Sequence, residues 1–438
     1  MDWKNLYDGR KCTADEAVRS IKSGDRVAFA HAAAEPRLLV EAMVKNAAAY
    51  KSVEICHMVT LGKGEYSKPE YKENFTFNGW FASETTRESI ALGHGDFTPV
   101  FFHEIPKYIR KGIFEIDVFM VMVSPPDKNG YCCIGVASDY TFQGVKSAKT
   151  VLAEVNNRVP TVFGDTFIHV SEIDKFVETS HPLPELALPH IGEVEKAIGQ
   201  NCAGLIEDGA TLQLGIGAIP DAVLHSLRDK KDLGIHSEMI SDGVVGLYEA
   251  GIINGSKKTL HKEKMIVSFL MGTKRLYDFV DFNPALELRT VDYVNDPVII
   301  ARNSKLVCIN SCMAVDFMGQ VVSDSIGIRQ FSGVGGQVDF VRGAAMSLDG
   351  LGKAIIAMPS AANKKDGSKV SKITPYIETG AAVTTSRNDV DYIVTEYGIA
   401  ELKGKTLKQR ARNLINIAHP DFREELKEEF EKRFRVKF

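Results

Sequence analysis

The residue whose type and position most directly suggest chemistry is the carboxylate Glu238, in the polar stretch His236-Ser-Glu-Met-Ile-Ser-Asp-Gly243. About 20 residues earlier stands a glycine corner, Gln213-Leu-Gly-Ile-Gly-Ala-Ile-Pro220. A glutamate can act as a nucleophile and form a covalent intermediate. Glycines at the end of a strand let backbone N–H groups approach a ligand, and a following helix adds free donors and partial positive charge. The spacing therefore indicates a nucleophile and a corner for a phosphate or an oxyanion.

Two other interpretations of these residues remain open. A Gly-x-Gly after a strand is often only a tight turn. An acid at the end of the next strand could hold a ribose hydroxyl, as in dinucleotide-binding units. Two features argue against a dinucleotide-binding unit. Pro220 replaces the third glycine of that fingerprint, and Glu238 lies in a polar loop. The sequence favours a specialised functional acid.

The elements that must position these residues follow a repeated order of strand, turn, helix and strand. The first half predicts a strand at 25–30, a helix at 38–49 after Pro36, and a second strand at 53–58. The same order of elements recurs in the second half, with a strand at 211–214, a helix start at Pro220 and a strand leading to Glu238. Such units imply parallel sheets.

The recurrence predicts two copies of one α/β domain. The fold class is two similar open α/β domains with mostly parallel sheets, an internal pseudo-repeat, and an active site between them. We place the domains at 1–192 and 193–438, because Pro182, Pro184 and Pro189 mark a linker. The first copy has His57-Met-Val59 where the second has Glu238. A residue present in one copy alone points to function.

The bulk properties exclude several classes of protein. The chain has 438 residues, a net charge of −4 and 44% hydrophobic residues. It lacks a basic run, so we expect no nucleic-acid partner. No apolar run reaches the roughly 18 residues of a membrane helix, and the charged start lacks a signal peptide's apolar region. We expect a cytoplasmic protein that needs no membrane.

The seven cysteines have no repeating spacing. This pattern argues against a disulfide framework and fits a reducing compartment. Cys132 and Cys133 are adjacent, and we interpret them as buried thiols in an apolar strand. Cys308 and Cys312 have no further Cys or His nearby in sequence, so we expect no metal site.

Several motifs together resemble the acetyl-CoA hydrolase/transferase family of class I CoA transferases. The motifs are Gly-Ile-Gly-Ala-Ile-Pro at 215–220, His-Ser-Glu-Met at 236–239, Ser-Gly-Val-Gly-Gly-Gln-Val-Asp-Phe at 332–340, Glu-Tyr-Gly at 396–398 and Ala-His-Pro-Asp-Phe at 418–422. The stretch 62–71 is similar to a 4-hydroxybutyrate-using subgroup. The resemblance covers essentially the whole chain.

The resemblance implies a transferase that moves CoA between a short-chain acyl-CoA, 4-hydroxybutyryl-CoA or butyryl-CoA, and acetate. Glu238 is then the nucleophile, which forms a glutamyl-CoA thioester. Coenzyme A is a substrate, and no cofactor is bound permanently. Short-chain carboxylates are the other partners, and the family suggests a homodimer. The sequence does not decide which carboxylate is preferred.

The resemblance and the glycine corner together give a set of expected site residues. We expect the CoA-binding residues to be Gly215, Ile216, Gly217, Ala218, Ile219, Met313, Gly335, Gly336 and Lys353. We expect Gln213 and His31 to bind substrate. A solvated lysine at a strand start remains the alternative for Lys353, and a hydrogen-bonded core histidine the alternative for His31. Glu154-Val-Asn156 resembles a family signature without an assigned role.

Three rival functions remain. A hydrolase would use the same glutamate with water as the acceptor. An NAD-dependent dehydrogenase would bind NAD. A non-enzymatic acyl-CoA binding protein would tolerate the loss of Glu238.

Overall fold

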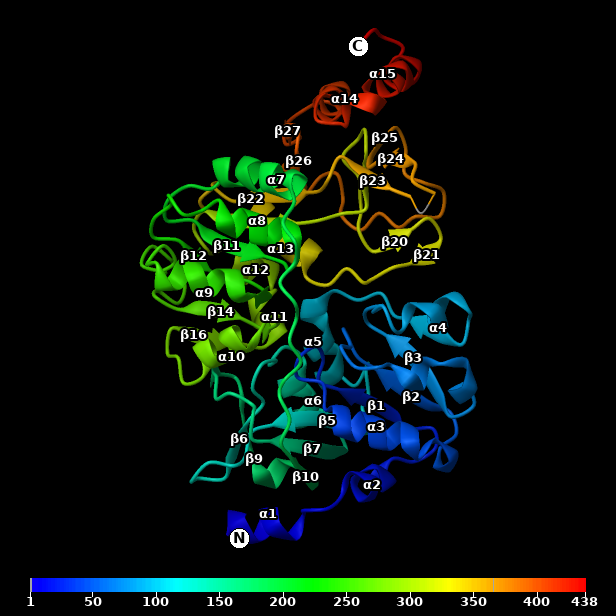
Figure 1. The fold of residues 1–438 in the computed structure, drawn as a ribbon, viewed down its shortest axis with the longest axis vertical. Helices are drawn as coiled ribbons and strands as arrows, with labels where there is room; N and C mark the ends of the chain where they lie inside the picture. Colours follow the sequence, from blue (N-terminus) through cyan, green and yellow to red (C-terminus); the bar gives the residue numbers. More distant parts are fainter. Residues whose placement is uncertain (1, 365) are drawn as a thin grey trace. The chain divides into compact units, whose positions relative to one another are not determined.

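The computed structural model describes residues 2–364 and 366–438 of the chain (Figure 1). They form two compact units. Unit 1 comprises residues 1–187, 266–294 and 330–335, and unit 2 comprises 188–265, 295–329 and 336–438. The chain thus returns to unit 1 twice after first leaving it. A contiguous division at 192/193 stays a prediction about the domains.

Unit 1 is built on one fully parallel sheet. Its strands, in spatial order, are β10 (Lys175–Thr179), β7 (Thr150–Asn156), β5 (Val118–Val123), β1 (Arg26–Phe29), β2 (Val53–Cys56), β3 (Phe75–Gly79) and β4 (Gly95–Phe97). Every residue of β5 is buried, as expected of a central parallel strand that is covered on both faces. The helices of this unit are α1 (Trp3–Gly9), α2 (Ala14–Ala17), α3 (Arg37–Lys45), α4 (Arg87–Ala91), α5 (Ile105–Arg110), α6 (Thr141–Ser147), α10 (Lys274–Val280) and α11 (Val291–Val294).

Unit 2 repeats this plan around a second sheet. Its strands are β12 (Gly234–Ile235), β11 (Thr211–Leu214), β17 (Leu306–Asn310), β22 (Lys353–Ala357), β26 (Tyr392–Thr395) and the antiparallel edge strand β27 (Gly398–Glu401). The order β12-β11-β17-β22-β26 matches β2-β1-β5-β7-β10 strand for strand. The predicted fold class, two similar α/β copies with mostly parallel sheets, is confirmed.

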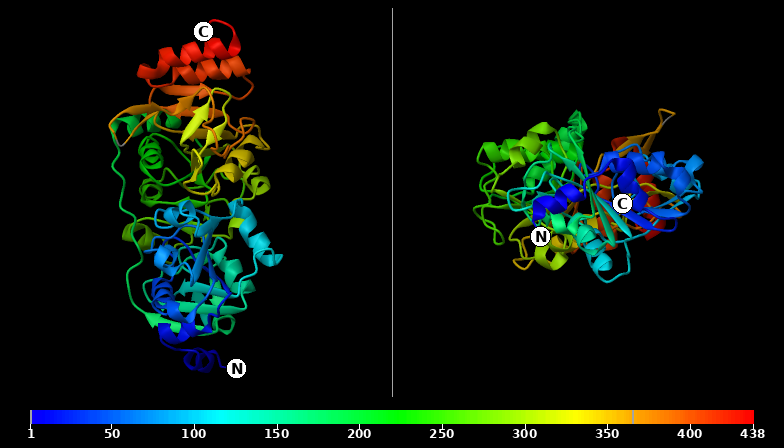
Figure 2. Two further views of the ribbon diagram at one scale, coloured as in Figure 1. Left: turned by 90° about the vertical axis from the view of Figure 1, so that its right-hand side faces the viewer. Right: turned by 90° about the horizontal axis from the view of Figure 1, so that it is seen from below.

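The helices of unit 2 lie around this sheet. They are α7 (Glu193–Gly204), α8 (Ala218–His225), α9 (Asp242–Glu249), α12 (Pro297–Ile300), α13 (Gln337–Ala345), α14 (Leu407–Asn416) and α15 (Pro420–Phe434). Helices α7 and α8 pack on each other, and α13 packs on β17 and β22. Figure 2 shows α14 and α15 side by side near the C-terminus. Leu426 and Phe430 are the buried residues of α15.

Helix starts in the structure carry recognisable local signals, and one of them lies earlier than predicted. Thr13 and Glu16 form a capping box at the start of α2, and Pro420 is the first residue of α15. Helix α8 begins at Ala218, two residues before the predicted start at Pro220. Proline is tolerated there because the N–H groups of the first helical turn have no intrahelical partner.

The cysteine interpretation agrees with the structure. All seven cysteines are free, and Cys132 and Cys133 are buried in β6 (Tyr131–Cys133). Burial raises the pKa of the Cys132 thiol to about 12. Among residues 2–364 and 366–438, no helix is long and apolar enough to cross a bilayer. The same residues contain no cluster of three or more potential metal-ligating side chains.

Candidate active site

Glu238 lies in unit 2 in the short loop between β12 and β13 (Met239–Ile240). Its side chain is half-buried, whereas Ser237 before it is fully buried. The Ser237 hydroxyl donates to the carbonyl oxygen of Met239 at 2.7 Å and to that of Leu214 at 3.2 Å. Leu214 is the last residue of β11, so these bonds fix the Glu238 loop beside the strand that carries the glycine corner.

The carboxylate of Glu238 is held by a buried amide. Asn295 Nδ2 donates to Glu238 Oε2 at 2.7 Å, and the Asn295 side chain is 0% exposed. The same Nδ2 lies 3.4 Å from Asp339 Oδ2 in the first turn of α13. An N–H donor to a carboxylate oxygen stabilises its negative charge and fixes its orientation. Asn295 therefore orients the carboxyl group of Glu238.

Gly336 brings the start of α13 against the same carboxylate. It is the N-cap residue of that helix, and a Cβ added there would collide with Glu238 Oε2 and Asn295 Nδ2. Only glycine leaves room for the Glu238–Asn295 pair. Gly336 therefore packs directly against the hydrogen-bonded pair formed by Glu238 and Asn295.

The rest of the 332–340 glycine cluster belongs to unit 1. Gly335 has a φ of +53°, and its carbonyl oxygen accepts a bond from Phe102 N at 3.4 Å. A Cβ on Gly333 would lie 2.9 Å from the carbonyl oxygen of Trp80. These glycines are required by backbone conformation and by close packing. A role of Gly335 in CoA binding stays a prediction.

The glycine corner borders an open pocket of about 300 Å³ in unit 2. Its lining residues are Glu195, Gly215, Ile216, Ala218, Ile219, Pro220, Ile309, Asn310 and Ser311. Gly217 stands at the N-cap of α8 with a φ of +113°, which side-chain-bearing residues rarely adopt. Because Pro220 carries no N–H, the amides of Ala218 and Ile219 are the first donors of the helix. The corner therefore presents backbone donors at a helix N-terminus beside a pocket.

Gln213 and Met313 lie near this edge of the sheet. Gln213 is buried on β11 and exchanges two side-chain hydrogen bonds with the pocket residue Asn310, at 3.1 and 3.4 Å. Gln213 thus supports the pocket through Asn310. Met313 is half-buried and follows β17, where its N–H donates to Val322 O at 2.8 Å.

Lys353 lies at the N-terminal ends of the strands of the same sheet, opposite the end that carries the glycine corner. It is the first residue of β22, whereas Gly215 follows the last residue of the parallel strand β11. Its ammonium donates to the carbonyl oxygen of Leu205 at 2.7 Å and to Glu207 at 3.1 Å. The structure does not bring Lys353 to the glycine corner, and its position matches the alternative of a lysine at a strand start.

His31 is in unit 1, at the end of β1, with an exposure of 1%. Its Nε2 lies 2.7 Å from Asp139 Oδ2, and its ring contacts Phe102 and Phe269. The other oxygen of Asp139 accepts bonds from the backbone and hydroxyl of Thr141. This is the environment of a hydrogen-bonded core histidine. A contact of His31 with substrate stays a prediction.

Glu154, which the sequence left without a role, is a buried structural anchor. Its exposure is 0%, and its Oε2 accepts the N–H of Leu38 at 2.8 Å at the start of α3. Its Oε1 lies 2.6 Å from His181 Nε2. This hydrogen bond, as the largest cause, raises the pKa of His181 above its usual value. Glu154 therefore fixes the first turn of α3 and the chain that follows β10.

Sequence reasoning missed Asn295 because nothing around it in Val291-Asp-Tyr-Val-Asn295 repeats or forms a motif. It lies 57 residues from Glu238 along the chain and meets it only in the folded unit. Asp339 lies within the 332–340 motif, but no local pattern pairs it with Glu238.

Comparison with known proteins identifies the family. The model of the acetyl-CoA hydrolase/transferase N-terminal domain matches residues 1–184, and that of the C-terminal domain matches 272–430. The chain is 59% identical to a 4-hydroxybutyrate coenzyme A transferase of Clostridium kluyveri, covering 99% of this chain and 100% of that one. It is 36% identical to a butyryl-CoA:acetate CoA-transferase of Anaerostipes caccae, over 99% of this chain and 98% of that one.

Solved structures agree with the sequence comparison. A crystal structure of 4-hydroxybutyrate CoA-transferase from Porphyromonas gingivalis is 44% identical with a TM-score of 0.84, covering 99% of this chain and 100% of that one. The fold and the two matched domains are those of a CoA transferase. The chain belongs to the acetyl-CoA hydrolase/transferase family, as the sequence motifs predicted.

The glycine corner can be tested with Gly215→Ala. A Cβ on Gly215 meets no atom within 4 Å, so the free protein should keep its stability. The methyl group would enter the space next to the pocket, where we expect the ligand. We expect KM for acyl-CoA to rise and kcat to fall, with an unchanged melting temperature. Unchanged kinetics would contradict a ligand at this corner. Gly217→Ala is the unsuitable variant, because φ +113° makes it strained in any case.

Proposed function

We propose that this protein is a CoA transferase that exchanges CoA between a short-chain acyl-CoA and acetate, with Glu238 as the nucleophile. The acyl-CoA is 4-hydroxybutyryl-CoA or butyryl-CoA, the substrates named for two full-length relatives. The single observation that carries the proposal is the half-buried carboxylate of Glu238, oriented by the buried amide of Asn295 at 2.7 Å.

The first half of the reaction moves CoA to the enzyme. A carboxylate oxygen of Glu238 attacks the thioester carbonyl carbon, the C–S bond breaks, and CoA leaves as its thiolate. The product is a mixed anhydride of Glu238 and the acyl group. The thiolate then attacks the Glu238 carbonyl carbon, and the first carboxylate leaves. The result is a glutamyl-CoA thioester.

The second half reverses these steps with acetate. Acetate attacks the glutamyl-CoA carbonyl, CoA thiolate leaves, and the thiolate then attacks the acetyl carbon of the new anhydride. Acetyl-CoA leaves, and the Glu238 carboxylate is restored. No net proton, electron or phosphate is consumed, because every thioester is exchanged for another.

Each addition creates an oxyanion that needs donors. The backbone amides at the start of α8 are suited to this role, since preorganised N–H groups stabilise the charge that develops on an oxyanion. One such donor is typically worth about 3–4 kcal/mol of barrier. Asn295 keeps Glu238 in place between the two steps.

The rival functions have less support. A hydrolase would use the same intermediate, but the full-length relatives reported above are named as transferases. A dehydrogenase has no support, because both halves of the chain match the CoA-transferase domains. We also keep a homodimer and a cytoplasmic location as proposals; the seven free thiols fit a reducing compartment.

The proposed exchange is tested by incubating the protein with butyryl-CoA, 4-hydroxybutyryl-CoA or propionyl-CoA together with labelled acetate. A transferase places the label in acetyl-CoA and releases an equal amount of the free acid. Free CoA that accumulates without labelled acetyl-CoA would identify a hydrolase instead. The relative rates with the three acyl-CoAs rank the substrates.

A further inference from the structure

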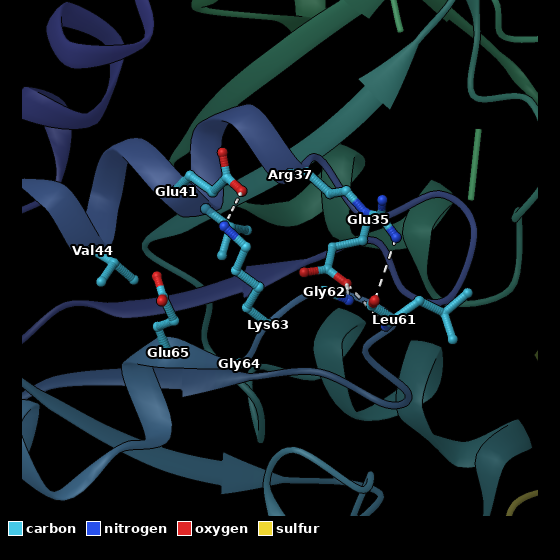
Figure 3. A pocket seen from close by; sticks show the side chains of 10 residues that line it. Glu35, Arg37, Glu41, Val44, Leu61, Gly62, Lys63, Gly64 and Glu65 are labelled. Atoms are coloured by element: carbon cyan, nitrogen blue, oxygen red, sulfur yellow. Dashed lines mark hydrogen bonds and ion pairs between the residues drawn. The ribbon is translucent and has the colours of Figure 1, made fainter. Parts of the chain in front are cut away.

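Unit 1 contains a pocket to which none of the candidate site residues belongs. It has a volume of about 210 Å³ and lies between α3 and the loop 61–65 (Figure 3). Its residues are Glu35, Arg37, Val40, Glu41, Val44, Leu61, Gly62, Lys63, Gly64 and Glu65. Arg37, Val40, Glu41 and Val44 belong to α3 at spacings of three, four and seven residues, which place them on one face of the helix. The wall is therefore mixed, with an apolar strip and charged groups.

The acids around this pocket already have partners. Glu41 pairs with Lys63 at 3.4 Å, and Glu65 pairs with Lys68 at 3.5 Å. Lys63 therefore already has an ion-pair partner in Glu41, and its side chain is largely exposed to solvent.

Glu35 is the third acid, and it is buried beneath the loop. Its Oε2 accepts bonds from Thr60 Oγ1 at 2.7 Å and Gly62 N at 2.8 Å. Burial, as the largest cause, raises the pKa of its carboxyl group.

Arg37 is the pocket cation that lacks such a partner. Its Nη2 donates to the carbonyl oxygen of Leu61 at 3.3 Å, and its Nε is buried without a hydrogen-bond partner. No carboxylate in the described chain lies within ion-pair distance of its guanidinium. A guanidinium has five N–H donors in a planar fork that matches a carboxylate. Most of that capacity is unused here.

The helix terminus itself is not the anion site. Arg37 is the first residue of α3, but the N–H of Leu38 is already bound by Glu154 Oε2 at 2.8 Å. The remaining attraction for an anion is therefore the side chain of Arg37, which borders the pocket.

We propose that this pocket binds a short-chain monocarboxylate, with its carboxylate on the Arg37 guanidinium and its alkyl chain along α3. Val40 and Val44 follow Arg37 at about 4.5 and 10.5 Å along the helix axis, at a rise of 1.5 Å per residue. Leu61 adds apolar surface from the facing loop. A chain of a few carbons fits this strip.

The charge pattern selects this ligand class over its rivals. A phosphate or dicarboxylate would bring a second negative charge close to Glu41 and Glu65. A cation would meet the positive charge of Arg37. A single carboxylate with an apolar tail satisfies Arg37 and covers the valines, and the proposal does not depend on the role of Glu238.

The test follows the methyl groups of the pocket valines by NMR in the full chain, labelled at valine, without any CoA. Val40→Ile assigns one signal and Val44→Ile the other. Butyrate should shift both signals saturably, whereas butan-1-ol and n-butylamine at the same concentrations should not. Because the readout is local, butyrate bound elsewhere in the molecule does not imitate it.

Variants then test the guanidinium. Arg37→Gln should weaken butyrate binding at least about tenfold, the order expected when a hydrogen bond between charged groups is lost. Lys63→Gln is the matched control, since it removes a cation that has its own carboxylate partner, and it should bind butyrate nearly as the parent does. If Arg37→Gln fails to fold, Arg37→Lys keeps the charge without the planar fork and should still bind more weakly. Equal shifts with butan-1-ol, or undiminished binding in a folded Arg37 variant, would overturn the proposal.

Discussion

Glu238→Gln should reduce CoA exchange to the background rate while leaving the protein folded. The amide lacks the anionic oxygen that attacks the thioester, so neither the anhydride nor the glutamyl-CoA thioester can form. Glu238 is half-buried, and an isosteric amide keeps an oxygen that can accept the bond from Asn295, so the replacement removes little packing. We expect a loss of at least about 1000-fold, comparable to the loss of other covalent nucleophiles. The measurement is the initial rate of labelled acetyl-CoA formation.

The control for this variant is its thermal unfolding. A melting temperature close to that of the parent shows that the lost activity comes from the missing nucleophile. Exchange near the parent rate in folded Glu238→Gln protein would show that another group carries CoA.

Gly336→Ala should cause the second large loss. The added Cβ would collide with Glu238 Oε2 and with Asn295 Nδ2, so the carboxylate must leave its oriented position. The tip of a glutamate can swing away without much loss of stability, but the nucleophile is then misplaced. A misplacement of about 1 Å can lower a rate about 100-fold. We expect kcat to fall by that order, measured by the same exchange assay.

Gly246→Ala is the matched control for this substitution. Gly246 lies inside α9 of the same unit, and a Cβ there meets no atom within 4 Å. Alanine is favoured over glycine in a helix by about 1 kcal/mol. We expect normal exchange and equal or higher stability. Full activity in folded Gly336→Ala protein would mean that the crowding near Glu238 has no catalytic consequence.

The sequence predicted those features of the fold that local signals encode. The strand β1 was predicted at 25–30, and the helix α3 was predicted to follow Pro36. The pseudo-repeat was visible because strands, glycines and prolines recur in the same order. It also predicted Glu238 as the special residue, because the first half has no acid at the matching place.

The remaining features arise from contacts between distant segments. Asn295 meets Glu238 across 57 residues, and no local pattern encodes that pairing. Lys353 was expected near the CoA site only from the family resemblance. Lys353 is the first residue of β22, and the glycine corner follows the last residue of β11. Because the strands run parallel, these two positions lie at opposite ends of the strands. The discontinuous units likewise follow from packing, because residues 266–294 and 330–335 join unit 1 in the folded chain.

The most direct test of the account is to trap the covalent intermediate. The protein is treated with butyryl-CoA in the absence of acetate and then with borohydride, which reduces a thioester but not a free carboxylate. We expect permanent inactivation, with Glu238 converted to an alcohol and a matching mass change in the peptide that contains His236-Ser-Glu-Met239. Borohydride alone should have no effect, and added acetate should protect by discharging the thioester. An unchanged peptide mass, in protein shown to exchange acyl groups, would contradict the glutamyl-CoA mechanism.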